Sequence, residues 1–106
     1  MKIIKYNKLV RDKIPEIITN KGDECITEVL SDEEYIKMLD RKLNEELEEY
    51  QADKSIEELA DLLEVIYAVA YARGYSRERL EKVRLEKANA RGAFEKRLFL
   101  KEVIEK

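Results

Sequence analysis

The stretch 42–67, KLNEELEEYQADKSIEELADLLEVIY, carries two groups of carboxylates on what its periodicity predicts to be two consecutive helices. The first group is Glu45, Glu46 and Glu49, and the second is Glu58 and Asp61. Residues three or four apart share one face of a helix, so each group forms a ridge of oxygen donors. If the two helices pair antiparallel, the ridges face each other across the helix pair.

Capping signals on both sides of this stretch set the limits of the two helices. We expect a long helix from the cap Ser31 to about Ala52, and a second from the cap Ser55 to about Arg73. The connection between them is very short, which makes them antiparallel neighbours. The pairing that brings the two carboxylate ridges together is therefore expected from the sequence.

The second of these helices is apolar on nearly all sides, which predicts that it is buried. Glu58 and Asp61 then open a buried ridge, where each like-charge pair at about 5 Å costs roughly 3 kcal/mol at an effective dielectric constant of about 20. A hard divalent cation offsets that cost, and Mg²⁺, with Mn²⁺ as an alternative, prefers such oxygen ligands. Ser55-x-x-Glu58 is also a capping box, so Glu58 as ligand or as cap stays open. Asp61 has no capping role.

The rest of the chain is expected to be mainly α, with a small β element near the N-terminus. Residues 2–10 suit a short strand or an extended arm, and residues 24–30 alternate well enough for a strand that pairs with it as a hairpin. Between them, residues 15–21 begin with proline and predict a short helix. A further helix is expected over residues 76–91, and the tail beyond residue 94 is left open between helix and strand.

Composition limits the class of protein. A chain of 106 residues fits one domain, 1–106. A net charge of −3 with 42% charged residues argues against a dedicated nucleic-acid binder, which usually shows a strongly basic face. No apolar run is long enough to span a membrane and no leader segment is evident, so no membrane partner is expected. The lone Cys25 suits a reducing cytoplasm, which is the expected location.

Basic residues gather at two places outside the carboxylate stretch. Lys8, Arg11 and Lys13 precede the short helix, and Lys87 and Arg91 lie on the apolar side of the last helix. Cations on a core-facing stripe are unusual. They either extend their charged ends to the surface or pair with structural acids, or else they contact an anionic substrate. The sequence alone leaves these readings open.

Three motifs together resemble one superfamily over most of the chain. The pairing of Glu45-Glu46-x-x-Glu49 with Glu58-x-x-Asp61 resembles the motif of the all-α nucleoside triphosphate pyrophosphohydrolases, the MazG-like and phosphoribosyl-ATP pyrophosphohydrolase-like proteins. The opening YNKLVRDKIP at residues 6–15 looks like the start of a small branch of that superfamily. Lys87-x-x-x-Arg91-Gly92-x-Phe94 looks like its late basic motif. The segment between the carboxylate groups, residues 50–57, is shorter than is typical there, which affects the loop's substrate contacts most.

The resemblance implies an antiparallel helical bundle that assembles as a homo-oligomer, a dimer or tetramer, with active sites near subunit interfaces. It implies hydrolysis of a nucleoside triphosphate between the α- and β-phosphates, which gives monophosphate and pyrophosphate. By match to the motif, Mg²⁺ is held by Glu46, Glu49, Glu58 and Asp61. Glu45 joins Glu46 in the catalytic role, as a further ligand or as the base that orients water. The residues that would hold the phosphates are Lys87 and Arg91, with Lys8, Arg11 and Lys13 as secondary contacts.

Other functions stay open at this stage. Hydrolysis of phosphoribosyl-ATP in histidine biosynthesis fits the same carboxylate motif. From a different class, the chain suits a non-catalytic helical interaction module whose acids are all solvated, or an inactive relative that only binds nucleotide. Burial of Glu58 and Asp61 separates the solvated module from a metal site.

Overall fold

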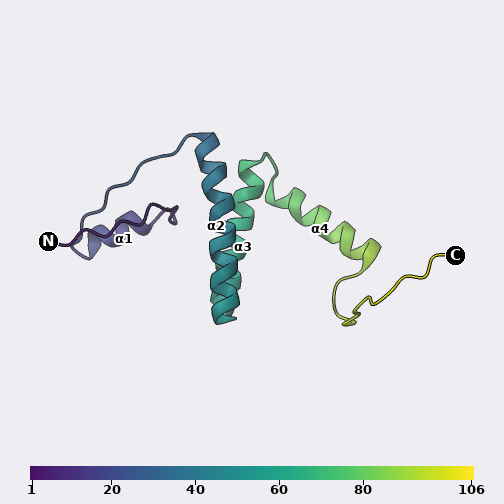
Figure 1. The fold of residues 1–106 in the computed structure, drawn as a ribbon. Coiled ribbons are helices and arrows are strands. Elements are labelled where there is room, and N and C mark those ends of the chain that lie inside the picture. Colours follow the sequence, from purple (N-terminus) through teal and green to yellow (C-terminus); the bar gives the residue numbers. More distant parts are fainter.

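A computed structural model describes residues 1–106, and all of its regular structure is helical (Figure 1). The helices are α1 (Ile14–Asn20), α2 (Asp32–Asp53), α3 (Ile56–Ala72) and α4 (Arg77–Arg91). The expectation of a mainly α chain is confirmed, and each predicted helix begins and ends close to its predicted limits. No helix is both long enough and apolar enough to cross a membrane.

The pair α2 and α3 forms an antiparallel hairpin, the only place where two helices pack along their length (Figure 1). Ser31 and Ser55 cap the two helices as predicted, each accepting a hydrogen bond from the backbone N–H three residues later. Lys54 adopts a left-handed conformation with φ of 60°, which ends α2 and reverses the chain within two residues. The turn therefore fixes the pairing that the carboxylate ridges require.

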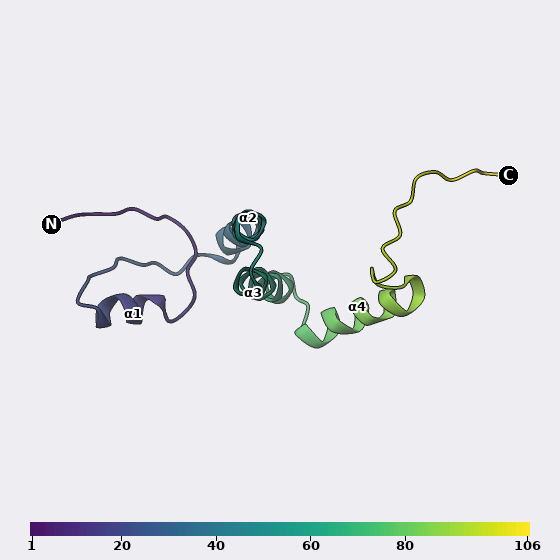
Figure 2. The same ribbon diagram turned by 90° about the horizontal axis from the view of Figure 1, so that it is seen from below.

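Helix α4 leaves the hairpin rather than packing along it. Gly74, with φ of 91°, ends α3 in the left-handed conformation that glycine adopts without strain, and Tyr75 N–H donates to the Ala70 carbonyl across the turn. Helix α4 contacts α3 only where the two join, and then points away (Figures 1 and 2). A single chain thus contains a helical hairpin with two outlying helices, and it does not close into a bundle.

The prediction of an N-terminal β element is wrong, because the structure has no strand. Residues 1–13 and 21–31 contain no strand, and Ile26 and Val29 are fully exposed. The alternation in residues 24–30 is a local pattern, but a strand also needs a partner and a surface to cover. Both segments are drawn as irregular coil, without strands, in Figure 2. An isolated two-stranded hairpin is at best marginally stable in water.

The buried core of one chain is very small. Only 3 of 106 residues are buried, namely Leu39, Ala70 and Glu46. The radius of gyration is 18.9 Å, whereas a compact chain of about 100 residues has roughly 13 Å. The prediction that the apolar helix α3 is buried therefore holds on one side only. Its outer side stays exposed at Ile56, Leu59, Leu63 and Ile66.

The most buried apolar side chain of the hairpin gives a test of the fold. Leu39 is 4% exposed, so Leu39→Ala is expected to lower the free energy of unfolding by about 2–5 kcal/mol through lost burial and a residual cavity. Urea denaturation followed by circular dichroism measures this. Val83→Ala, at a side chain that is 44% exposed on α4, is the control and should change stability by much less. Equal effects of the two substitutions would contradict the packing described here.

Candidate metal centre

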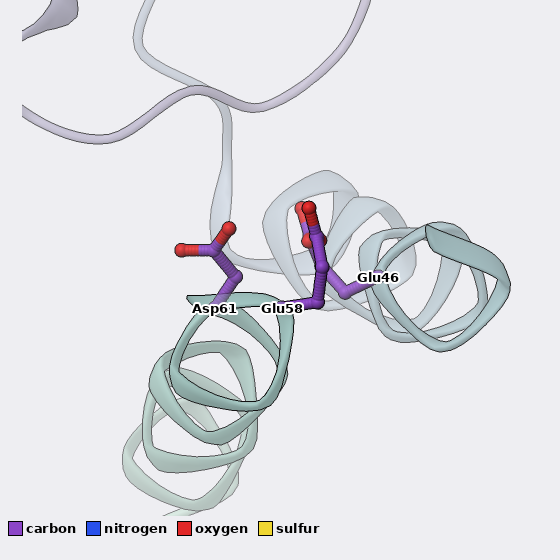
Figure 3. A group of neighbouring side chains, drawn as sticks. All are labelled: Glu46, Glu58 and Asp61. Carbon is purple, nitrogen blue, oxygen red and sulfur yellow. The ribbon is translucent and has the colours of Figure 1, made fainter. Parts of the chain in front are cut away.

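Three carboxylates converge between α2 and α3 near the turn that joins them. Glu46 comes from α2, and Glu58 and Asp61 come from the first turns of α3 (Figure 3). One oxygen of each lies within 4.8 Å of the other two. The i, i+3 spacing of Glu58 and Asp61 places them on one face of α3, and antiparallel pairing brings that face to Glu46. We call Glu46, Glu58 and Asp61 the carboxylate cluster.

Two oxygens of the carboxylate cluster are buried without a hydrogen-bond partner. Glu46 is only 6% exposed, and its Oε2 has no partner. Glu58 Oε2 is also buried and unpartnered. A buried carboxylate oxygen that accepts no hydrogen bond is costly, and native structures rarely leave one so. These oxygens are the strongest indication that the cluster has a ligand.

The structure contains one of the two hydrogen bonds that a capping box at Ser55 and Glu58 would have. Ser55 Oγ accepts from Glu58 N–H at 3.3 Å, so the backbone of Glu58 serves the cap. The reciprocal hydrogen bond from Ser55 N–H to the Glu58 side chain is absent, and Oε2 of that side chain has no partner. The carboxylate of Glu58 is therefore available as a ligand while its backbone takes part in the cap.

Electrostatics inside the carboxylate cluster disfavour ionisation of two members. Desolvation is the main cause that raises the pKa of Glu46, and the charges of Glu49 and Asp61 add to it, although Lys42 opposes them. Desolvation also raises the pKa of Glu58, with further contributions from neighbouring acids. The positive charge of a divalent cation at this position would offset both effects.

Lys42 and Lys8 neutralise part of this negative charge. Lys42 Nζ lies 3.3 Å from Glu46 Oε1 and 3.5 Å from Glu45 Oε1. Lys8 Nζ donates to the same Glu45 oxygen at 3.1 Å, and this hydrogen bond raises the pKa of Lys8. Desolvation opposes ionisation of Glu45, but the two lysines outweigh it and lower its pKa. Lys42 was not among the predicted site residues, although its spacing of three and four residues from the two glutamates indicates such contacts.

Arg11 reaches the carboxylate cluster from a distant part of the sequence. Its Nη2 donates to Asp61 Oδ1 at 2.7 Å. Arg11 and Lys8 were predicted as phosphate contacts, and here both pair with acids at or beside the carboxylate cluster. Nothing local in the sequence indicates these pairs, which join residues 50 and 37 positions apart. Lys13, predicted with them, is exposed at the start of α1 and forms no ion pair.

The remaining predicted residues lie outside the carboxylate cluster. Glu49 is exposed and is not one of the three converging carboxylates, although its charge raises the pKa of Glu46 and Glu58. Lys87 and Arg91 are exposed near the far end of α4, which points away from the hairpin (Figure 1). Their side of α4 is not a buried stripe in one chain. A single chain does not bring these two cations to the carboxylate cluster.

The donor set suits a hard cation. Carboxylate oxygens are what Mg²⁺ prefers, and oxygens that share one Mg²⁺ lie at most about 4 Å apart. A spacing within 4.8 Å requires only small side-chain adjustments to reach that value. The chain has no histidine, and its one cysteine is not among the converging groups, so softer metals lack their usual ligands.

The raised pKa of Glu46 predicts how stability depends on pH. A raised pKa in the folded chain means that Glu46 contributes stability below its unfolded pKa, which is lost as pH rises through its folded pKa. Without divalent cation, Glu46→Gln is therefore expected to melt higher than the wild type at neutral pH, with the difference vanishing in acid. Glu81 gives the opposite sign, because a hydrogen bond from Arg84 lowers its pKa, so Glu81→Gln should not stabilise. Thermal denaturation from acid to neutral pH measures both, and a Glu46→Gln variant that melts lower than wild type at neutral pH would contradict the assignment.

Comparison with known proteins gives a match over part of the chain. An uncharacterized protein of Mycolicibacterium smegmatis is 49% identical over 45 residues, which are 42% of this chain and 46% of that protein. The match thus spans about half the length of the relative. No family model and no solved structure matches the chain.

Proposed function

We propose that this chain is a Mg²⁺-dependent nucleoside triphosphate pyrophosphohydrolase. The observation that carries the proposal is the pair of buried, unpartnered oxygens of Glu46 and Glu58, which converge with Asp61 at a spacing suited to a hard cation. The resemblance of these residues to the superfamily motif gives the reaction class. Mn²⁺ is the expected substitute, because it accepts the same ligands.

The reaction is hydrolysis of one phosphoric anhydride. The oxygen of water forms a bond to the α-phosphorus, the bond from that phosphorus to the bridging oxygen breaks, and pyrophosphate leaves. Mg²⁺ bound at the carboxylate cluster would neutralise phosphate oxygens and lower the pKa of a bound water. The protein's part is positioning and electrostatics, because phosphoryl transfer requires little covalent chemistry from the enzyme.

Each residue takes a role that its surroundings suit. Glu46, Glu58 and Asp61 are the ligands, and Glu49 adds negative charge at the border of the carboxylate cluster. Glu45 is a weak base, because its lysine contacts lower its pKa. We therefore assign Glu45 to holding Lys8 and Lys42 rather than to proton abstraction.

The alternative functions differ in what they require of these residues. The expected burial of Glu58 and Asp61 is only partial, because both residues are half-buried and the Asp61 side chain is 40% exposed. Glu46, at 6% exposure, is the acid that a module with solvated carboxylates does not explain. An inactive nucleotide binder would keep the metal ligands and lose turnover. Phosphoribosyl-ATP remains the alternative substrate, since it presents the same anhydride to the same ligands.

The chain is further proposed to work as a homo-oligomer, a dimer or tetramer, in which a second copy completes the helical bundle. The outer side of α3 exposes Ile56, Leu59, Leu63 and Ile66 at helical spacing. A monomer with three buried residues has little burial to offset its chain entropy. Packing two copies through this side of α3 buries the apolar stripe on both.

Substitution of Asp61 tests the proposed reaction. Asp61→Asn is expected to reduce metal-dependent pyrophosphate release by at least about 100-fold, as expected when a metal site loses a ligand, while circular dichroism stays helical. The assay measures pyrophosphate and monophosphate from canonical and modified nucleoside triphosphates and from phosphoribosyl-ATP, with Mg²⁺ and with EDTA. In the wild type, saturating Mg²⁺ should also raise the melting temperature.

Asp40→Asn is the matched control, because Asp40 pairs with Arg73 on the hairpin as Asp61 pairs with Arg11, but lies outside the carboxylate cluster. It should leave turnover within about twofold of the wild type. Full turnover in Asp61→Asn would refute the site. Release from phosphoribosyl-ATP alone would change the substrate and leave the site standing.

Substitution of Leu63 tests the assembly. Leu63→Glu places a charge in the proposed contact of α3 and is expected to shift the chain from oligomer to monomer in sedimentation velocity. Val83→Glu on α4, at nearly the same exposure of 44% against 45%, is the control and should leave the mass unchanged. A wild-type chain that sediments as a folded monomer at all concentrations would overturn this proposal.

A further inference from the structure

The N-terminal segment, residues 1–30, is joined to the hairpin by very few polar contacts. Helix α1 packs against none of the other helices. The hydrogen bonds and ion pairs that reach the hairpin are Lys8 with Glu45 and Arg11 with Asp61. In Figure 2 the chain before α1 approaches the hairpin and then turns back. Electrostatic attraction to the hairpin's acids is therefore the main polar contribution to its position.

Arg11 binds the same carboxylate that the proposed metal needs. Its Nη2 lies 2.7 Å from Asp61 Oδ1, at the length of a charge-assisted hydrogen bond. A divalent cation bound to Asp61 would lie about 2 Å from a carboxylate oxygen. The guanidinium and the cation would then be only a few ångströms apart and would repel each other. Arg11 and the metal compete for Asp61.

The cations around the carboxylate cluster differ in how they are attached. Lys42 projects from the middle of α2 and is only 18% exposed, so it stays beside Glu46. Arg11 lies in a segment without regular structure, and its side chain is 59% exposed. Leaving Asp61 costs Arg11 one exposed ion pair, and such pairs contribute little to stability. Of the two, Arg11 is the cation that a metal can displace at small cost.

We propose that Lys8 and Arg11 make the N-terminal segment an electrostatic latch on the carboxylate cluster, which a divalent cation opens by displacing Arg11 from Asp61. The latch rests on the proposed function, because it requires that the carboxylate cluster bind a divalent cation. Arg11 lowers the apparent metal affinity of the site, and metal binding removes one of the two contacts that hold the segment, leaving Lys8 with Glu45. The segment is thereby a sensor of whether the site is loaded.

Metal affinity of single variants tests the latch. The probe is Mn²⁺, titrated into the full chain with free Mn²⁺ followed by electron paramagnetic resonance. Arg11→Gln is expected to bind Mn²⁺ about two- to fivefold more tightly than the wild type, since no ion pair has to be broken. Arg11→Lys keeps a charge at this position and should restore most of the wild-type affinity. Unchanged or weaker binding by Arg11→Gln would overturn the latch.

Lys5→Gln is the matched control, because it removes one positive charge from the same segment at an exposed residue without an acidic partner. Lys5→Gln should leave the Mn²⁺ affinity nearly unchanged. If it raised the affinity as much as Arg11→Gln does, the gain would come from net charge alone, and the latch would be overturned. As a second readout, the backbone heteronuclear NOE of residues 8–12 should fall on saturation with Mg²⁺. Values that stay constant would contradict release of the segment.

The same titration separates failure of the latch from failure of the proposed function. A wild type that binds no Mn²⁺, or an Asp61→Asn variant that binds it as the wild type does, would refute the metal site and the latch with it. A wild type that binds Mn²⁺ and loses it in Asp61→Asn, while Arg11→Gln matches the wild type, would refute the latch alone.

Discussion

Repulsion among the carboxylates of Glu46, Glu58 and Asp61 determines which charged residues gather around the hairpin. The tight turn of the hairpin brings them together, and α2 keeps Glu46 almost wholly out of water. Desolvation and mutual charge raise the pKa of Glu46 and Glu58, so the hairpin alone is electrostatically unfavourable there. Positive charge must be supplied from elsewhere, and the arrangement of the neighbouring residues follows from that need.

That positive charge comes from groups with different freedom to move. Lys42 belongs to α2 and remains beside Glu46 whatever else binds. Lys8 and Arg11 belong to a segment that no helix packing holds, so their attraction to acids positions the segment as much as it neutralises the carboxylate cluster. In the proposed latch, a change of charge at the carboxylate cluster therefore also changes how strongly the N-terminal segment is held. This coupling needs no motion within the hairpin itself.

The sequence predicts correctly those features that depend on residues close together in the chain, such as the helix limits and the turn between α2 and α3. The caps Ser31 and Ser55 set the starts of α2 and α3, and the short connection implied the pairing that joins Glu46 to Asp61. The contact of Arg11 with Asp61 spans 50 residues and has no local pattern, so it was out of reach. The strand expected over residues 24–30 failed for a related reason, because alternation describes a strand but does not supply its partner. The apolar residues around α3 predict that the helix is covered on nearly all sides. Within one chain only α2 packs along it, and the other side stays exposed.

Helix α3 links the chemistry of the site to the assembly of the chain. Its inner side carries Glu58 and Asp61, and its outer side exposes the stripe that includes Leu63. With so few residues buried in one chain, covering of the outer stripe in the proposed oligomer would add much of the burial that keeps α3 against α2. Loss of assembly would then loosen the hairpin and separate the three ligands without altering any of them. If the chain works as the proposed oligomer, its proposed activity should depend on chain concentration. A substitution on the outer side of α3 should then reduce activity as the loss of a metal ligand does, except where both variants are compared at the same oligomeric state.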